Sequence, residues 1–288
     1  MVSFLPVSRP AQAARALFSA LVDDAGLFPP EELDMASAVA RHRCDRSAGS
    51  PVLSHRFVVA AGRLPELQSL LTSSDRFAAS VITEATFASV SRVTALVAAD
   101  GRLELAGVEA TLLTDWRSDP AVVTDALGQF PNETAVFVEI PVRGDIKPAL
   151  DLLQKRGWSA KIRCGGIRSE LFPSTGQLAD AITACAARGI AFKATAGLHH
   201  AIRYRDPVTG FTHHGFLNIL LAVTRAVSGA ETQLVTDALE TTDPAELVTE
   251  TTAVDPATAA RARELFVSYG SCSTSDPIND LTALNLLT

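Results

Sequence analysis

The chain has 288 residues, of which 47% are hydrophobic and 20% are charged, a composition typical of a globular protein rather than of a disordered or fibrous one. Its 25 basic and 32 acidic residues give a formal net charge of −7, so nucleic acid is not expected as the main partner. We expect a cytoplasmic protein, because no apolar run is long enough to span a membrane and the N-terminus does not resemble an export signal.

The N-terminal 55 residues are predicted to form a helical segment packed on the main part of the domain, which covers residues 56–288. Residues 14–22 and the sequence MASAVARH favour helices. Between them, the sequence DDAGLFPPEEL supplies Gly and Pro as stop signals. Asp23 and Asp24 open this stretch, and we expect them to initiate the turn rather than to take part in a site.

A different pattern begins at residue 56, where short β-branched runs alternate with amphipathic stretches at intervals of about 25 to 30 residues. This alternation is typical of consecutive β/α units. Six units can be recognised, and their strands are predicted at residues 56–61, 79–85, 106–112, 135–142, 159–165 and 190–197.

Two of the helices between these strands have clear boundary signals. Asp145 is predicted to cap the first, which ends at Gly157. Ser174 or Thr175 is predicted to cap the second, which ends at Gly189. Apolar residues recur with helical spacing between each pair of signals, so both helices should bury one face.

The last quarter of the chain is less regular. The runs HGFLNILLAVTRAV, TQLVTDALE and DPATAARARELF favour helices, and SYGSCS is a candidate for a last strand, so two strands of an eight-stranded barrel lack a clear place. No GxGxxG follows the first strand, and the regular spacing favours closure of the sheet. We therefore predict an α/β fold of the (β/α)8 TIM-barrel type, with one domain overall and an irregular last quarter.

The predicted strands carry charge on one face only. Because side chains alternate across a strand, residues two apart share a face. The wholly apolar face should pack against the helices, so the face with the charged residues should point into the barrel. The charged residues placed inside in this way are Glu84, Glu109, Glu139, Lys161, Arg163 and Lys193, and Thr195 points inward with them. Ionised groups in a dry core cost several kcal/mol unless they are paired, and catalytic groups of barrels stand at the carboxyl ends of the strands. The six charges therefore indicate either a site or a buried neutralising network, or the assumed alternation is shifted by one residue.

Lys193 is the candidate nucleophile. A lysine attacks a carbonyl group only as a neutral amine, and neighbouring cations lower its pKa. Lys161 and Arg163 are expected to have this effect, with Glu139 as the general acid or base. In the alternative interpretation the three cations simply hold an anionic substrate.

Two segments resemble the lysine strands of deoxyribose-phosphate aldolase. FKATAGLHH (192–200) is similar to the Schiff-base strand of that family, and KIRCGGIR (161–168) is similar to the strand of its second lysine. The resemblance implies a class I aldolase reaction with an imine on Lys193 and with Lys161 beside it. It is local, because the two strands occur in the opposite order in that family. The chain as a whole is more similar to an uncharacterised bacterial barrel family with the blocks DDAGLFPP, KIRCGG, FKATAGLHH, HGFLN and SYGSCS.

Four of the six histidines, His199, His200, His213 and His214, lie close together in the sequence. With a carboxylate they form a candidate site for a divalent metal, zinc or iron, although their spacing matches no established metal motif. Acid–base catalysis, anion binding or a solvated loop are the other interpretations. Asn218 follows them at a helix start that could present N–H groups to an anion, or it is a core amide. The four cysteines show no CxxC spacing and are expected to be reduced thiols.

The leading hypothesis is an enzyme that makes or breaks a carbon–carbon bond in a small anionic carbonyl compound, without a cofactor. Its predicted catalytic residues are Lys193, Lys161, Glu139 and His199. The predicted substrate-binding residues are Arg163, Thr195, His200, His214, Asn218, Gly165 and Gly166. The alternatives are a metal-dependent lyase, isomerase or hydrolase that uses the histidine cluster, and a non-catalytic binding barrel. Apart from the substrate, neither nucleic acid nor membrane is expected as a partner, and a homo-oligomer is left open.

Overall fold

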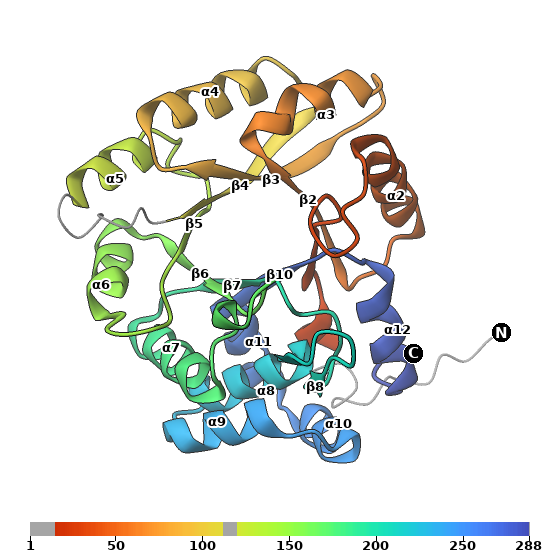
Figure 1. Cartoon of the computed structure of the whole chain (residues 1–288), viewed down its shortest axis with the longest axis vertical. Coiled ribbons are helices and arrows are strands. Elements are labelled where there is room, and N and C mark those ends of the chain that lie inside the picture. Colours follow the sequence, from red (N-terminus) through yellow and green to blue (C-terminus); the bar gives the residue numbers. More distant parts are fainter. Residues whose placement is uncertain (1–14, 112–119, 288) are drawn as a thin grey trace.

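Eight parallel strands close into a barrel in the computed structural model, which describes residues 15–111 and 120–287 (Figure 1). Each strand pairs with the next along the chain, and the last pairs with the first. The predicted (β/α)8 fold is therefore confirmed. The barrel strands are β1 (Val22–Asp24), β2 (Leu53–Ala60), β3 (Phe77–Glu84), β4 (Leu103–Thr111), β5 (Val136–Glu139), β6 (Ser159–Arg163), β7 (Phe192–Thr195) and β10 (Phe266–Ser271).

Helices surround the barrel and alternate with its strands (Figure 1). Up to β7, these helices are α2 (Met35–Ala48), α3 (Leu64–Leu70), α4 (Phe87–Ala98), α5 (Pro120–Leu127), α6 (Lys147–Arg156) and α7 (Thr175–Arg188). The later ones are α8 (Phe216–Val227), α9 (Thr232–Glu240), α10 (Pro244–Ala253), α11 (Pro256–Leu265) and α12 (Ser275–Ala283). Within the two described ranges, no helix has the length and apolar character that crossing a membrane requires.

The two strands that lacked a clear place are β1 and β10, and β10 overlaps SYGSCS (268–273), the predicted candidate for a last strand. The prediction of a separate N-terminal helical segment is wrong, because β1 belongs to the barrel and β2 begins before residue 56. β1 escaped notice because it has only three residues, Val-Asp-Asp, and two aspartates are typical of a turn. Residues 14 and 112, at the ends of a predicted helix and a predicted strand, lie outside the described residues.

The predicted boundaries of α6 and α7 agree well with the structure. Ser174 caps α7 in a capping box with Gln177, and the helix ends at Gly189 in a left-handed conformation. α6 likewise ends at Gly157. Its N-cap is Ile146 rather than the predicted Asp145, although the Asp145 carboxylate still accepts a hydrogen bond from a backbone N–H of the first turn.

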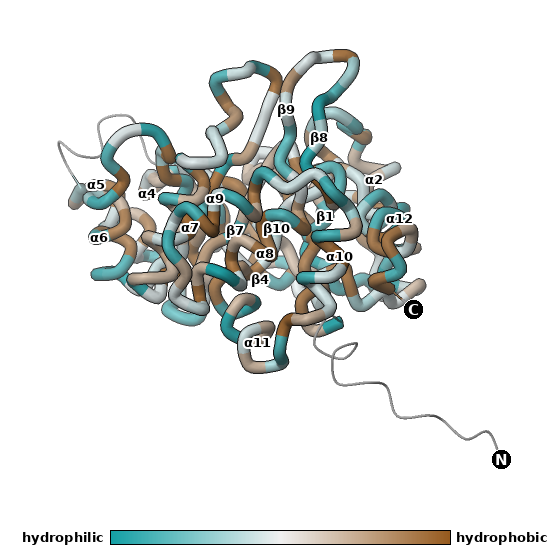
Figure 2. The backbone as a smooth tube through the Cα atoms, turned by 90° about the horizontal axis from the view of Figure 1, so that it is seen from below, coloured by the Kyte–Doolittle hydropathy of each residue, from teal (hydrophilic) through white to brown (hydrophobic). Residues whose placement is uncertain are grey.

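The connection between β7 and β10 accounts for the irregular last quarter. It contains the hairpin of β8 (Tyr204–Arg205) and β9 (Thr212–His213), followed by four helices. α8 is buried over most of its length because α7, α9, α10 and α11 pack against it. The hairpin rises above the end of the barrel where the carboxyl ends of the strands lie (Figure 2).

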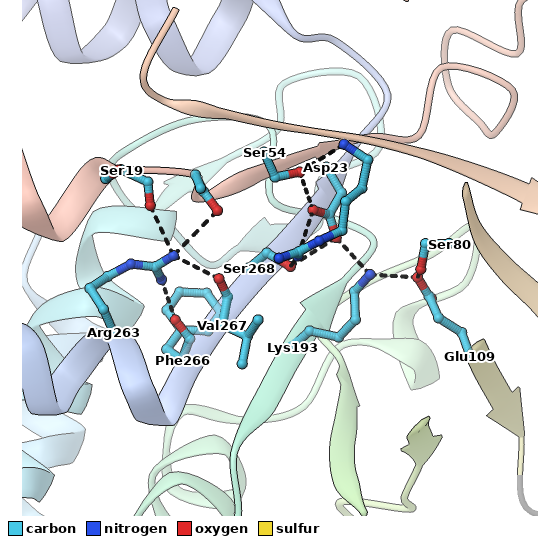
Figure 3. A network of polar contacts seen from close by, with 12 residues as sticks. Ser19, Asp23, Ser54, Ser80, Glu109, Lys193, Arg263, Phe266, Val267 and Ser268 are labelled. Atoms are coloured by element: carbon cyan, nitrogen blue, oxygen red, sulfur yellow. Dashed lines mark hydrogen bonds and ion pairs between the residues drawn. The ribbon is translucent and has the colours of Figure 1, made fainter. Parts of the chain in front are cut away.

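Arg263 of α11 ties the first and last strands together at the opposite end of the barrel. Its guanidinium group donates hydrogen bonds to main-chain carbonyls on both sides of this seam (Figure 3). Burial lowers the pKa of Arg263 to about 10. The carbonyls belong to Ser19 and Ala20, before β1, and to Phe266 and Val267, at the start of β10. A side chain from the irregular part of the chain thus links the two strands whose pairing closes the barrel.

Candidate active site

Charged side chains of alternating sign form a continuous chain across the interior of the barrel. Six of the eight strands contribute, and each charge contacts the next through an ion pair. This arrangement satisfies groups that would otherwise be costly to bury. In spatial order the members are Arg56, Asp23, Lys193, Glu109, Lys161, Glu139 and Arg163.

Lys193 stands in the middle of this chain and is 1% exposed. Its Nζ lies 2.7 Å from Asp23 Oδ2 and 2.5 Å from Glu109 Oε1 (Figure 3). Burial lowers the pKa of Lys193, but the two carboxylates outweigh burial and hold the pKa above its ordinary value. The side chain is therefore an ammonium group at neutral pH. The expectation that neighbouring cations lower this pKa is wrong, because carboxylates stand between the cations.

Glu109 is the shared anion of the cluster. Its Oε1 contacts Lys193 and accepts a hydrogen bond from Ser80 Oγ at 2.8 Å, and its Oε2 lies 3.0 Å from Lys161 Nζ. Burial raises the pKa of Glu109, but the two lysines lower it further, so that it reaches about 2. Glu109 is thus held as a carboxylate by two cations.

Glu139 joins Lys161 to Arg163 on the side of the cluster nearest the solvent. Lys161 Nζ lies 3.3 Å from Glu139 Oε2, and Arg163 Nε lies 2.8 Å from Glu139 Oε1. Burial raises the pKa of Glu139, whereas Lys161 and Arg163 lower it, and the net effect is a lowered pKa. The Arg163 side chain is 37% exposed, while those of the two lysines are almost completely buried.

The predicted inward orientation is confirmed for five of the six charges. These five are Glu109, Glu139, Lys161, Arg163 and Lys193. Glu84 stands at the carboxyl end of β3, where it is exposed and makes no contact with the cluster among the described residues. β3 extends beyond the level of the cluster, so Glu84 does not reach the cluster although it lies on the inward face of the strand.

A cavity of about 350 Å³ opens above the charged chain at the carboxyl ends of the strands. Lys161, Lys193 and the carboxylates of Glu109 and Glu139 form its floor, and Arg163 and Thr195 lie beside them. Much of the remaining wall is apolar, with contributions from Phe28, Val58, Ile82, Leu171 and Leu198. A small apolar cavity with a few convergent polar groups at this end of a barrel is the usual form of an active site.

His199 and Cys272 line another part of the same cavity. Cys272 Sγ lies 3.5 Å from His199 Nδ1. Burial lowers the pKa of His199 and raises the pKa of Cys272, so the pair consists of a neutral imidazole and a protonated thiol at neutral pH. The backbone of Cys272 is fixed by Arg41, which donates to its carbonyl at 2.7 Å.

The other three histidines of the predicted cluster point to different partners. His200 lies beside Asp280, His213 contacts the carbonyl of Gly197, and His214 contacts the carbonyl of Pro173. Burial lowers the pKa of His214 to about 4. In the part of the chain that the structure describes, no three His, Cys, Asp or Glu side chains are placed to hold a metal ion. The predicted zinc or iron site at His199, His200, His213 and His214 is therefore not formed by these residues.

Four of the predicted substrate-binding residues do not line the cavity: Asn218, His200, His214 and Gly165. Asn218 is completely buried and uses its amide to bind the backbone: it accepts from the N–H of Arg203 and donates to the carbonyls of Ala238 and Thr241. It is a core amide, and its predicted role in anion binding is wrong. His214 is engaged in the core and His200 faces the outer side of the loop, so neither lines the cavity.

Two glycines allow the ends of β6 and β7 to approach closely. A Cβ atom at Gly165 would lie 2.8 Å from the Cα atom of Gly197, which has a positive φ of 74°. Gly166, Thr195 and Gly197 line the cavity, whereas Gly165 forms the contact behind them. Gly165 thus shapes the site, and Gly166 and Thr195 are placed where binding residues are expected.

Three residues of the site are not expected from the sequence: Asp23, Arg56 and Cys272. The sequence predicts a turn at Asp23, but this residue is completely buried and also accepts a hydrogen bond from Ser268 Oγ at 2.8 Å. Arg56 shares a strand face with Val58 of the cavity wall, so the alternation applied to β2 would have found it. No sequence signal places Cys272 beside His199, because the last strand had no clear position in the barrel.

No protein-family model matches this sequence, and no curated protein matches it at significant similarity.

Proposed function

We propose that this protein is an enzyme that makes or breaks a carbon–carbon bond in a small anionic carbonyl compound, through an imine on Lys193. One observation carries the proposal: Lys193 and Lys161 lie in register on neighbouring strands at the floor of the cavity and share the carboxylate of Glu109. A buried lysine with carboxylates in contact has both a nucleophile and proton acceptors in one place.

The first step is transfer of a proton from the Lys193 ammonium group to Glu109, whose Oε1 lies 2.5 Å from Nζ. A substrate that fills the cavity displaces water, and a low dielectric favours the neutral amine and acid over the ion pair. The amine then attacks the carbonyl carbon. The carbonyl oxygen takes up one proton from the attacking nitrogen and one from the Glu109 acid, and it leaves as water. The product is a protonated imine beside the restored Glu109 carboxylate, and it withdraws electrons from the neighbouring carbon–carbon bond.

Glu139 is the proposed acid or base for the bond-forming or bond-breaking step. It lies between Lys161 and Arg163, and it lines the cavity. An anionic substrate group that binds Arg163 would displace the Glu139 carboxylate from it. Glu139 would then lose one of the two cations that lower its pKa. Its pKa then rises towards the range that is useful for proton transfer. His199, a neutral imidazole on the cavity wall, is the second proposed proton carrier.

A second candidate function is favoured by the raised pKa of Lys193. As a permanent ammonium group, Lys193 stabilises an enolate or alkoxide oxygen without forming a covalent bond. Glu139 then abstracts the proton next to the carbonyl group. This mechanism suits an isomerase or a lyase that acts through an enolate, and it needs no neutral lysine.

Borohydride trapping separates the two mechanisms. The enzyme is incubated with pyruvate, acetaldehyde or dihydroxyacetone phosphate, reduced, and digested, and the modified peptide is identified by mass spectrometry. The chain has only four lysines, Lys147, Lys155, Lys161 and Lys193, so an adduct can be assigned without a variant. We expect the reduced adduct on Lys193.

Two variants complete the test. Lys193→Met should form no adduct, and Lys155→Met, which removes an exposed lysine from α6, should form as much as the wild type. An adduct that maps only to another lysine would overturn the assignment to Lys193. Saturable binding of a carbonyl compound without any adduct would favour the second candidate function.

A further inference from the structure

The residues that line the cavity carry an excess of one positive charge. Within the described ranges, the cavity is lined by the cations Lys161, Lys193 and Arg163 and by the carboxylates Glu109 and Glu139. His199 and Cys272 contribute no charge at neutral pH. Asp23 and Arg56 form a pair that contacts the cluster from outside the cavity lining and leaves this balance unchanged.

Of the three cations that line the cavity, Arg163 has the most hydrogen-bond donors left for a ligand. Its Nε donates to Glu139 at 2.8 Å and its Nη2 reaches the same carboxylate at only 3.5 Å. In contrast, Lys193 is held by two carboxylates, and Lys161 contacts two as well. The guanidinium group is also the most exposed of the three cations. Its planar set of donors matches a carboxylate group.

The cavity is small and largely apolar apart from its floor. A volume of about 350 Å³ lies at the lower end of the range for small-molecule sites, and Val58, Ile82 and Leu198 are among its wall residues. A ligand with two negative charges would leave a net negative charge in a poorly solvated site, which is costly. A ligand with one negative charge and a short apolar part leaves the site neutral. Formation of an imine does not alter this balance, because a protonated imine carries the same charge as the ammonium group.

We infer that the substrate is a short oxo acid with a single carboxylate, bound through Arg163, rather than a phosphorylated carbonyl compound. The inference rests on the proposed function for the placement of the carbonyl group at the lysines. Arg163 lies two residues beyond Lys161 on the same face of β6, and both contact Glu139. A carboxylate on Arg163 therefore lies within reach of the floor, and the adjoining carbonyl group points to Lys193.

The test measures binding by calorimetry without borohydride, so that it does not depend on the imine. Pyruvate, 2-oxobutyrate and dihydroxyacetone phosphate are titrated into the wild type, Arg163→Gln and Arg168→Gln. Arg168 is an exposed arginine in the loop after β6 and does not line the cavity, so it is the matched control. We expect both oxo acids to bind more tightly than the phosphate. Arg163→Gln should weaken their binding by about tenfold or more, and Arg168→Gln should leave it unchanged.

The outcomes separate this inference from the proposed function. The inference is overturned if dihydroxyacetone phosphate binds more tightly than the oxo acids, or if Arg163→Gln and the wild type bind pyruvate equally well. This holds even if the bound compound forms an adduct on Lys193. Pyruvate binding that depends on Arg163 but yields no adduct on reduction supports the inference and overturns the imine. Neither variant should fail to fold, since both arginines are partly or fully exposed.

Discussion

Lys161 and Lys193 are register partners on neighbouring strands, and one carboxylate, that of Glu109, contacts both ammonium groups. Two like charges at the same level of a barrel interior would repel each other strongly without an anion between them. Glu109 therefore decides the charge state of the site. It is also the group whose removal affects both lysines at once.

Glu109→Gln is expected to lower the free energy of unfolding by about 3 kcal/mol at pH 7, because it leaves two buried ammonium groups with one carboxylate fewer. Urea unfolding followed by circular dichroism measures this loss. Glu104→Gln is the matched control, since Glu104 is an exposed residue of the same strand. A loss no larger than that of the control would contradict the ion-pair arrangement.

The same variant should respond differently to acid. The pKa of Glu109 is lowered from 4.5 to about 2 in the folded protein, so its contribution is complete above about pH 4.5 and is lost as the pH falls towards 2. The shift corresponds to roughly 3 kcal/mol. The difference in stability between wild type and Glu109→Gln should therefore shrink between pH 5 and pH 3, and a constant difference would contradict the lowered pKa.

Much of the barrel could be predicted from the sequence, because its strands repeat at regular intervals and the helices between them have clear caps. β1 could not, since a strand of Val-Asp-Asp has neither the length nor the composition of a typical strand. The position of β10 depends on closure against β1 and β7, which are distant in the sequence. Local patterns cannot show such pairings.

The candidate site was predicted in part for the same reason. Alternation along single strands identified the inward charges, such as Lys161 and Lys193. It could not show which charge contacts which, so the carboxylates between the cations and the raised pKa of Lys193 were missed. Clustering in the sequence misled in part. The ring centroids of His199 and His213 lie 5.6 Å apart, but each of the four histidines has a polar partner of its own.

Asn218→Ala should affect stability and leave ligand binding unchanged. Removal of the buried amide leaves the N–H of Arg203 and the carbonyls of Ala238 and Thr241 without this partner, so we expect a loss of about 3 kcal/mol in urea unfolding. The affinity for pyruvate, measured on the folded variant at low temperature, should equal that of the wild type. A selective loss of affinity with unchanged stability would restore Asn218 to the binding site.

His214 should make the protein less stable in mild acid. Burial lowers its pKa from 6.5 to about 4, so the stability that depends on the neutral ring is complete above about pH 6.5 and is lost as the pH falls through 4. His214→Gln, which keeps a donor for the carbonyl of Pro173, should lose less stability than the wild type between pH 7 and pH 4.5. Urea unfolding at these two values tests this, with the exposed His200→Gln as the control. Parallel behaviour of all three proteins would show that His214 does not titrate as its burial requires.

Lys193→Met should be destabilised more at pH 8 than at pH 5. In the wild type, the pKa of Lys193 is raised, so the stability from its ion pairs is present below 10.5 and is lost as the pH rises through the folded value. In the variant, the carboxylates of Asp23 and Glu109 lose the cation that both contact. The pKa of Glu109 then rises, because Lys193 is the strongest of the charges that lower it, and the folded variant takes up a proton more readily in acid.

The loss in free energy of unfolding relative to the wild type should therefore be about 3 kcal/mol or more at pH 8 and clearly smaller at pH 5. Urea unfolding at both values measures it, and Lys155→Met should show no deficit at either. A deficit that is the same at pH 5 and pH 8 would mean that Lys193 stabilises the barrel by packing alone and that no carboxylate depends on its charge.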